Sequence, residues 1–388
     1  MGQYGMVLDL NKCLGCQTCV VACENLWTKH KGMHHMHWRN VETRPGHGFP
    51  KNWENYGGGW KPDFKGDKRK PPLGAPSPGL KKGEIPHADA YGSAARYDYK
   101  KGLFEGEMYS KTADKVTVPP EGEHLNWGAN WDEDIGLGGN PDDNYYFYLP
   151  RLCNHCTDPA CVAACPRHAV YKRQEDGIVL IDQKRCRGYR FCMEACPYKK
   201  IFFNEITNTS QKCIFCFPRV EKGAANACAA QCPGRVMFVG SVDDKNGNIY
   251  RLVNEFKVAL PLHPEYGTNP NIYYIPPLSP FKINEDGSLS SETKIPIEYL
   301  GSLFGGVDKV SYAHGVLLKE IENARRGIKS ELIDMFGLEQ RQLFQLIYSK
   351  GAAFGAVYER KGYLHLNKKE IASMNRYLYK KTLPEAPK

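Results

Sequence analysis

The chain has 388 residues, enough for two or three domains with a sizeable buried core, and its 41% hydrophobic and 24% charged residues are ordinary for a folded protein. The longest apolar runs, such as Ile178–Ile181, are strand-sized and fall short of the roughly 20 residues that span a bilayer, so we predict no direct membrane span. The formal charge of +9 would suit a nucleic-acid-binding protein, an interpretation that the cysteine pattern below argues against.

The first predicted element is a strand that leads into a run of cysteines. Met6–Cys13 (MVLDLNKC) reads as a β-rich segment, a polar turn and a first cysteine, and it lacks the basic start and apolar core of a secretory signal. The run has the spacing C-x2-C-x2-C-x3-C and consists of Cys13, Cys16, Cys19 and Cys23.

A long segment of weak periodicity follows, rich in Gly, Pro, Trp and Tyr. A free loop of this length is unusual in a compact domain, and Trp and Tyr are favoured at interfaces. We therefore predict an irregular insertion that wraps over a partner subunit. No cysteine or carboxylate completes a metal site near its first histidines, so we interpret these as surface or interface residues: His30, His34, His35 and His37.

Three more cysteine runs come after the insertion. The second run has Cys153, Cys156, Cys161 and Cys165; the third has Cys186, Cys192 and Cys196; the fourth has Cys213, Cys216, Cys228 and Cys232. Ile178–Cys186 (IVLIDQKRC) repeats the strand, turn and cysteine of the N-terminus, and further strands are predicted at Ile201–Phe203 and Arg235–Val239.

The last part of the chain begins with Pro-rich loops, and from about Ser311 its apolar residues take helical spacing. The helical segments are VSYAHGVLLKEIENARR and ELIDMFGLEQRQLFQLIYSK. The sequence leaves open whether these helices pack on the core or dock a partner.

The four runs are variants of the bacterial ferredoxin pattern C-x2-C-x2-C-x3-C-P, which holds iron–sulfur clusters. Two-residue gaps aim three sulfurs at three irons, and the three-residue step begins a helix that carries the fourth cysteine to the neighbouring cluster. Disulfides are disfavoured because the count of fifteen cysteines is odd and the chain is long. Zinc sites use pairs rather than runs ending in Cys-Pro, and no CxxC is followed by the His that covalent haem needs.

Applying this crossover to every run uses all the cysteines and predicts three [4Fe–4S] clusters and one [3Fe–4S] cluster. The first group is Cys13, Cys16, Cys19 and Cys232; the second is Cys23, Cys213, Cys216 and Cys228; the third is Cys153, Cys156, Cys161 and Cys196; and the fourth is Cys165, Cys186 and Cys192.

Tyr189 stands where the spacing of the third run would place a cysteine. With three thiolates the natural occupant is a three-iron cluster, and the tyrosine ring is expected to fill the missing corner and exclude water. A four-iron cluster with phenolate or water on its fourth iron remains the alternative.

These elements predict an α+β fold of two nested ferredoxin-like two-cluster units with a long irregular insertion and a helical C-terminal extension. The predicted divisions are an outer unit of residues 1–30 plus 200–245, the insertion 31–144, an inner unit 145–199, and the extension 246–388. Each four-iron cluster with its thiolates carries about −2, so four clusters offset most of the positive charge. We therefore predict no nucleic-acid partner.

The chain resembles the iron–sulfur β subunits of the molybdenum (DMSO reductase) family, which serve nitrate reductase, nitrite oxidoreductase, ethylbenzene dehydrogenase, selenate reductase and perchlorate reductase. The resemblance covers roughly residues 5–310 and lies in VLDLNKCLGCQTCVVACENLW, RNVETRPGHGFPKNWE, YLPRLCNHCTDPACVAACP, YKRQEDGIVLIDQKRCRGYRFCMEACPYKK and KCIFCFPRVEKG. In that family an aromatic residue at the position of Tyr189 accompanies a [3Fe–4S] cluster.

This resemblance implies a molybdenum-cofactor catalytic α subunit, which the insertion would contact, and a haem b γ subunit. Electrons would pass between them through the clusters of Cys13, Cys23, Cys153 and then the three-cysteine group. The chain would carry electrons without being catalytic, in nitrite oxidation or nitrate reduction, with a hydrocarbon dehydrogenase or a selenate or perchlorate reductase as the alternative and a stand-alone electron carrier as a further one. The resemblance implies a periplasmic or equivalent location reached with the α subunit, or alternatively the cytoplasmic face of the membrane.

Overall fold

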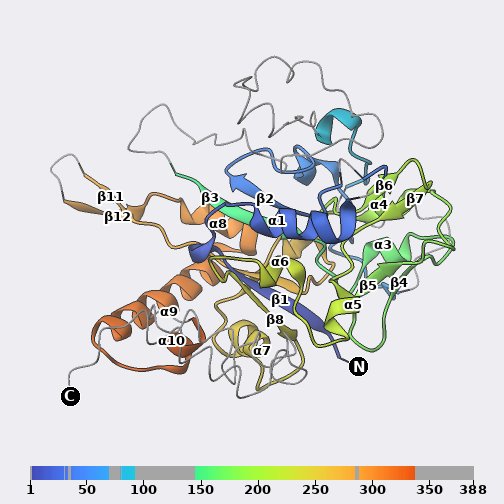
Figure 1. Cartoon of the computed structure of the whole chain (residues 1–388). Helices are drawn as coiled ribbons and strands as arrows, with labels where there is room; N and C mark the ends of the chain where they lie inside the picture. Colours follow the sequence, from blue (N-terminus) through green and yellow to red (C-terminus); the bar gives the residue numbers. More distant parts are fainter. Residues whose placement is uncertain are drawn as a thin grey trace, which may run out of the picture.

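A four-stranded sheet in the order β8-β1-β10-β9 lies at the centre of the computed structural model, which describes residues 2–29, 31–33, 36–69, 79, 81–91, 145–284 and 288–336 (Figure 1). Its strands are β1 (Tyr4–Asp9), β8 (Met237–Ser241), β9 (Leu260–Pro261) and β10 (Ile272–Ile275). β1 runs antiparallel to β8 and parallel to β10, and β9 is antiparallel to β10.

The other described strands form four separate antiparallel pairs, β2–β3, β4–β5, β6–β7 and β11–β12. Their bounds are β2 (Arg39–Arg44), β3 (Phe147–Leu152), β4 (Val170–Lys172), β5 (Val179–Ile181), β6 (Phe202–Asn204), β7 (Thr209–Gln211), β11 (Phe281–Ile283) and β12 (Leu289–Thr293).

Helices are short except near the end of the described chain. The α-helices are α1 (Thr18–Cys23), α3 (Ala160–Ala163), α4 (Phe191–Ala195), α5 (Phe217–Val220), α6 (Ala227–Ala230), α7 (Asn248–Tyr250), α8 (Ile297–Phe304), α9 (Val307–Arg325) and α10 (Glu331–Phe336). The other helical turns are η1 (Leu10–Lys12), η2 (Glu24–Thr28), η3 (Trp53–Tyr56), η4 (Ala88–Tyr91), η8 (Arg251–Glu255) and η9 (Pro264–Tyr266). None of the described helices has the length and apolar character needed to cross a membrane.

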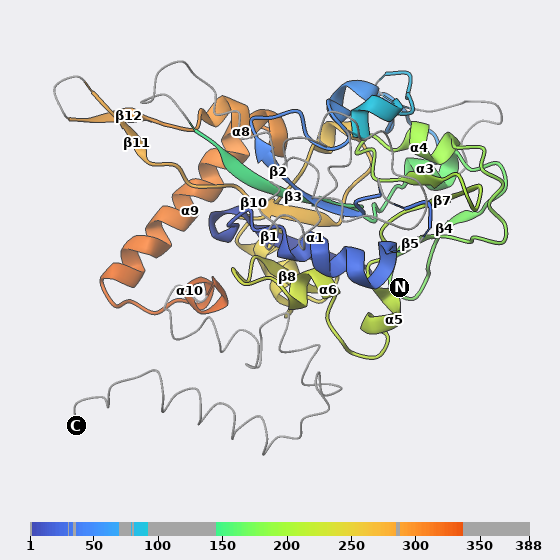
Figure 2. The same ribbon diagram turned by 45° about the horizontal axis from the view of Figure 1, so that its top comes forward.

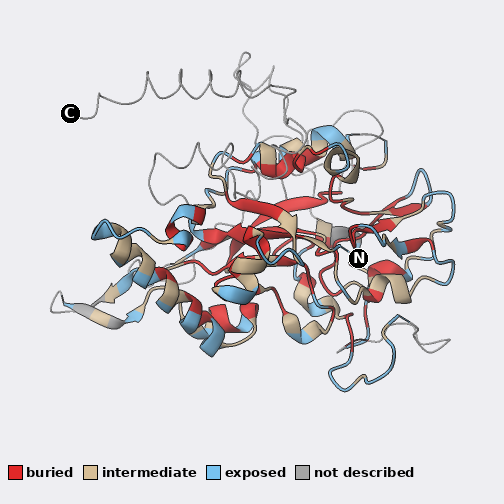
Figure 3. Cartoon of the chain, turned by 90° about the horizontal axis from the view of Figure 1, so that it is seen from below, coloured by how far each residue is buried: buried red, intermediate tan, exposed pale blue. Residues whose placement is uncertain are grey.

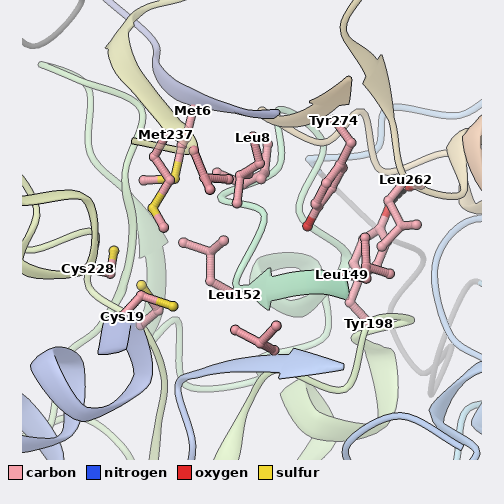
Figure 4. Close-up of a cluster of buried hydrophobic side chains, with 14 of the residues drawn as sticks. Met6, Leu8, Cys19, Leu149, Leu152, Tyr198, Cys228, Met237, Leu262 and Tyr274 are labelled. Atoms are coloured by element: carbon pink, nitrogen blue, oxygen red, sulfur yellow. Dashed lines mark hydrogen bonds between the residues drawn. The ribbon is translucent and has the colours of Figure 1, made fainter. Parts of the chain in front are cut away.

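Strand β1 separates two hydrophobic cores because its side chains alternate between the faces of the sheet. Met6 and Leu8 point into the larger core, which also contains cysteines of the first and fourth runs. Figure 4 shows Met6, Leu8 and Met237 on the same side as the sulfurs of Cys19 and Cys228. Val7 points into the second core. The buried stretches of the chain gather in the middle of the molecule (Figure 3).

The second core answers the question that the sequence left open about the C-terminal helices. Leu317 of α9 and Leu332 and Met335 of α10 are buried in it together with Val7 of β1. The described part of these helices therefore packs on the chain's own sheet, at the opposite end from α3 and α4 (Figure 2). Helix α8 precedes the predicted start of the helical region, and residues 337–388 lie outside the described residues.

Mixed helices and small sheets confirm the α+β class, and strands β1, β5, β6 and β8 form at or within two residues of the predicted segments. The strand pairing differs from that of two independently closed ferredoxin-like units. β3 and β6 flank the inner unit but do not pair with each other; β3 pairs with β2 and β6 pairs with β7. The β2–β3 ladder thus joins the inner unit to the insertion, whereas the β6–β7 ladder lies within the outer unit. The division into units stays a prediction.

The tryptophans in the described N-terminal part of the insertion pack inside the chain itself, and the predicted contact of the insertion with a partner subunit stays a prediction. Trp53 and Trp60 are 0% exposed, and the Trp60 indole N–H donates to the carbonyl of Asp158 at 2.8 Å. These aromatic side chains belong to the chain's own core, so they do not indicate a covered partner. His37 is buried against Phe49 rather than at a surface. His30, His34, His35 and residues 92–144 lie outside the described residues.

A buried ionic network fixes this part of the insertion to the cluster-bearing core. Glu42 of β2 is 0% exposed and binds Arg44 at 2.9 Å and Arg151 of β3. Burial by itself raises the pKa of Glu42, but Arg151, Arg44 and Lys200 outweigh it and lower that pKa to about 2. One carboxylate therefore balances several buried cations.

We predict that Glu42→Gln destabilises the protein strongly, because it leaves buried cations without their anion while changing little volume. Removing one partner of a buried pair costs about 3–5 kcal/mol, which lowers the midpoint of anaerobic guanidinium unfolding. Glu322→Gln is the control, because Glu322 pairs with Arg326 on the exposed side of α9 and such pairs contribute about 1 kcal/mol or less. Equal midpoints for the two variants would contradict the prediction.

Candidate metal centres

The same tight turn recurs in all four cysteine runs. The second residue after each opening cysteine has a positive φ, at Gly15 (67°), His155 (42°), Gly188 (68°) and Phe215 (53°). At Gly15 a Cβ would also lie 2.5 Å from the Tyr148 ring, so this position requires glycine. The turn directs backbone N–H groups at sulfur: Phe215 N–H donates to Cys213 Sγ at 3.4 Å, and Gly15 N–H donates to Cys13.

A second turn recurs after the three cysteines that precede proline. The third residue beyond each has a positive φ, namely His168, Lys199 and Arg235. The next backbone N–H then donates back to the cysteine sulfur: Ala169 to Cys165 at 3.3 Å, Val236 to Cys232 at 3.5 Å, and Lys200 to Cys196. Both turns place N–H dipoles where they stabilise negative charge on sulfur.

Two of the predicted cysteine groups line cavities. One cavity is lined by Cys13, Cys16, Cys19 and Cys232 together with Gln17, Val41 and Met237. Another is lined by Cys153, Cys156, Cys161 and Cys196 together with His155, Tyr198 and Thr268. Each cavity brings together cysteines from two different runs, as the crossover rule predicts.

In the other two groups, the thiols lie close enough to one another to raise each other's pKa. Burial raises the pKa of Cys23 well above its usual value, and the neighbouring thiols of Cys213, Cys228 and Cys216 raise it further. Burial raises the pKa of Cys192 to about 12, opposed by a hydrogen bond with Ser210 and assisted by Cys165 and Cys186. The structure therefore brings each predicted set of cysteines together.

Helix packing explains this convergence. α1 and α6, which carry cysteines of the first and fourth runs, pack against each other, and α3 packs against α4 from the second and third runs. The β1–β8 ladder, with Leu8 opposite Met237, brings the strand before Cys13 beside the strand after Cys232. Cysteines more than 200 residues apart in the chain thus share one site.

The four groups also form a single file. Cys19 of the first group lies close to Cys228 of the second, Cys213 of the second lies close to Cys153 of the third, and Cys196 of the third lies close to Cys192 of the fourth. Solvent exposure is greater at the end formed by the first group than in the middle of this row of cysteine groups. Cys16 in the first group is exposed, whereas all four cysteines of the second group are buried.

The donor sets fit iron–sulfur clusters. They consist entirely of thiols, the soft ligands that such clusters use, and they are surrounded by N–H donors suited to an anionic cluster. Within the described chain, no three His, Cys, Asp or Glu side chains are arranged to hold a single metal ion.

Comparison with known proteins agrees with this chemistry. Residues 144–242 match the family described as a 4Fe-4S dicluster domain. The chain is 49% identical to the β subunit of dimethylsulfide dehydrogenase from Rhodovulum sulfidophilum, over 89% of this chain and 98% of that one. It is 50% identical to the β subunit of selenate reductase from Thauera selenatis (86% and 95% covered) and 50% identical to that of respiratory nitrate reductase from Haloferax mediterranei (86% and 90% covered).

The chain belongs to the β subunits of molybdenum-dependent oxidoreductases. Such a subunit carries electrons by means of iron–sulfur clusters and is not the catalytic subunit, as the resemblance implied. The predicted family and the role in electron transfer are confirmed.

Tyr189 of this β subunit takes the place in the third run that Cys16 has in the first, and its role beside the fourth cluster stays a prediction. The side chain is 57% exposed and contacts Phe191, with 6.4 Å between the ring centroids. Cys16 is exposed as well and still lines the cavity of the first group, so exposure at this position of the loop is compatible with a place beside the cluster.

Two buried cations lie among the thiols, and sequence reasoning did not single them out. Arg39 of β2 is 1% exposed and lowers the pKa of thiols in both the first and the second groups, where burial is the larger, opposing influence. Lys212 is 2% exposed, donates to the carbonyl of Cys213 at 2.9 Å, and lowers the pKa of Cys161 and Cys213. Neither position has a local motif that marks it.

We predict that Cys232→Ala damages the site of Cys13, Cys16 and Cys19 and leaves the site of Cys228 intact. Combining Cys232→Ala with Cys16→Ala should therefore lose no more iron than either single change, because both remove ligands of one cluster. Combining it with Cys228→Ala should lose about twice as much. Iron analysis of anaerobically purified variants checks this, and additive losses for Cys232 and Cys16 would refute the grouping.

Proposed function

We propose that this chain relays electrons through three [4Fe–4S] clusters and one [3Fe–4S] cluster, between a molybdenum-cofactor catalytic subunit and a haem b subunit. The single file of thiol groups carries this proposal. It begins at Cys13, Cys16, Cys19 and Cys232 and ends at Cys165, Cys186 and Cys192.

The clusters would supply the one-electron redox sites, and the residues of the chain have three tasks. The cysteines bind the clusters, and the inward N–H groups of the two recurring turns stabilise the charge on sulfur. The core side chains exclude water from the middle of the file, since all four cysteines of the second group are buried. A water-free, preorganised environment lowers the reorganisation energy of electron transfer, because few dipoles have to turn when a cluster changes its charge.

The open ends of the file are the proposed docking sites for the two partner subunits. Cys16 marks one end, beside Leu14, which is 67% exposed. Tyr189 and Phe191 mark the other, at 57% and 40% exposed. Following the order implied by the resemblance, we assign the catalytic subunit to the Cys16 end and the haem subunit to the Tyr189 end.

For the reaction served, we propose nitrate reduction or its reverse, nitrite oxidation. The 50% identity to the β subunit of a respiratory nitrate reductase supports it. The similar identities to β subunits of dimethylsulfide dehydrogenase and of selenate, chlorate and perchlorate reductases keep those reactions as the second candidate. The substrate-binding site would belong to the catalytic subunit, so the neighbouring catalytic gene and turnover by the native complex discriminate between them.

Native mass and cofactor analysis tests the assembly. We propose that the chain is purified in a complex with molybdenum and haem b, in the periplasm or an equivalent compartment that it reaches together with the catalytic subunit. Recovery as a stable coloured monomer would favour a stand-alone carrier instead, and fractionation to the cytoplasmic face of the membrane would favour the other location.

The cluster content predicts about fifteen irons and about sixteen acid-labile sulfides per chain. Iron, sulfide and zinc analysis of fully loaded protein, normalised to amino-acid analysis, checks this. A metal content dominated by zinc would end the hypothesis. About sixteen irons would instead indicate four four-iron clusters.

The type of the fourth cluster can be tested at Tyr189. Three thiolates leave one corner of a four-iron cluster without sulfur, and cysteine thiolates, not phenols, are the usual ligands of such clusters. The oxidised wild-type protein should therefore show the paramagnetic signal of a three-iron cluster. Tyr189→Cys restores the ligand spacing and should abolish that signal, with one additional iron bound per chain and a lower potential for the fourth cluster.

Tyr189→Phe is the matched control and should keep the three-iron signal, because it changes no ligand. If intact, oxidised wild-type protein shows no such signal, water or Tyr189 ligates a fourth iron. The electron-transfer function would stand in that case, but the cluster type would be wrong.

A further inference from the structure

The guanidinium of Arg39 is buried in the chain's interior without an ordinary partner. The residue is 1% exposed, and none of its three side-chain nitrogens has an oxygen or nitrogen partner among the described residues; the polar group beside it is the thiol of Cys19. An isolated buried cation is costly, so a native structure that contains one needs a compensating anion. No carboxylate fills this role for Arg39 in the described chain.

Strand alternation explains why Arg39 faces the thiols and not the carboxylates. Along β2, Asn40, Glu42 and Arg44 belong to the ionic network of Arg151 and Lys200. The odd-numbered positions point to the opposite face. Val41, two residues from Arg39 on this face, lines the cavity of the first thiol group, and its carbonyl accepts a hydrogen bond from Gln17.

Helix α1 packs against β2 and carries cysteines of two groups, Cys19 near its beginning and Cys23 at its end. The charged neighbours of Arg39 are correspondingly sulfurs from both groups. Cys19 is the first of them, followed by Cys228 and Cys232, and Cys13, Cys23 and Cys216 also interact with it. The residue therefore lies at the boundary between the first two sites.

We infer that Arg39 is a positioning residue for electron transfer, a fixed positive charge between the first two clusters that raises the reduction potentials of both. This inference rests on the proposed function. One-electron reduction adds one negative charge to a cluster; no bond changes and no proton moves, and Arg39 stays protonated throughout. A nearby fixed cation in a low-dielectric interior stabilises the reduced form over the oxidised one.

The test is a potentiometric titration of the loaded complex, followed by EPR, for wild-type protein, Arg39→Gln and Arg39→Lys. Arg39→Gln should make reduction of two of the three four-iron clusters harder by on the order of tenfold in equilibrium constant, which is about 59 mV for one electron. Arg39→Lys retains the charge and should show a smaller shift. The three-iron cluster, whose EPR signal is distinct, should keep its potential in every variant.

Arg44→Gln is the matched control, because it removes the same charge from the same strand. Arg44 pairs with Glu42 at 2.9 Å and Glu54 at 3.0 Å, so its loss should leave all four potentials unchanged. Unchanged potentials in Arg39→Gln, or a shift of all four clusters together, would overturn the inference.

The iron content of each variant shows whether a changed potential comes from the lost charge or from a lost cluster. If Arg39→Gln loses iron, Arg39→Lys decides: retention of iron with near wild-type potentials supports a role for the charge, and equal loss in both variants contradicts it. If the wild-type protein contains no iron–sulfur clusters, the proposed function itself fails, independently of Arg39.

Discussion

The ladder between β1 and β8 is the constraint on which the rest of the structure depends. Its register places Met6 opposite Val239 and Leu8 opposite Met237, so the chain segments before Cys13 and after Cys232 lie side by side. β1 also separates the two cores, with Met6 and Leu8 on the cysteine side and Val7 on the side of the C-terminal helices. A shift of one residue would exchange these faces and point the apolar side chains of β1 into the wrong cores.

The other ladders repeat this relation around the whole set of cysteine runs. The strand that leads into each run pairs with a strand that follows another run: β3 with β2, β5 with β4, and β7 with β6. The β4–β5 and β6–β7 pairs are local, but the β1–β8 and β2–β3 ladders close long loops, which costs conformational entropy before contacts can compensate. Clusters that take ligands from two runs act as cross-links across these same loops, so cluster insertion and folding are expected to stabilise each other.

The cysteine grouping could be predicted from the sequence because ligand spacing is a local property and the crossover follows from the helix after the third cysteine. Features that depend on long-range packing could not. The aromatic residues of the insertion suggested a partner, yet Trp53 packs beside Arg151, its ring centroid 3.5 Å from the guanidinium, because β2 pairs with β3 across the insertion. Tyr189 lies on a loop like that of Cys16, as its spacing predicts, and the role of its ring beside the fourth cluster stays a prediction. Arg39 looks like any strand residue in the sequence, and its place among the thiols follows only from the packing of α1 against β2.

The buried cations give the positive formal charge a different meaning from that of a surface patch. Arg39, Lys199, Lys200 and Lys212 are each at most 2% exposed, so they are not available to phosphates in solution. Removing a cation from water costs several kcal/mol unless an anion compensates for it. Glu42 compensates Lys200, but Arg39 and Lys212 have thiols as their nearby acidic groups. Because burial raises the pKa of thiols such as Cys13 to about 12, these groups are neutral at pH 7 unless a metal deprotonates them. We therefore expect bound clusters to offset most of the energetic cost of Arg39, and the carbonyls of Val179 and Cys213 to share that role for Lys212.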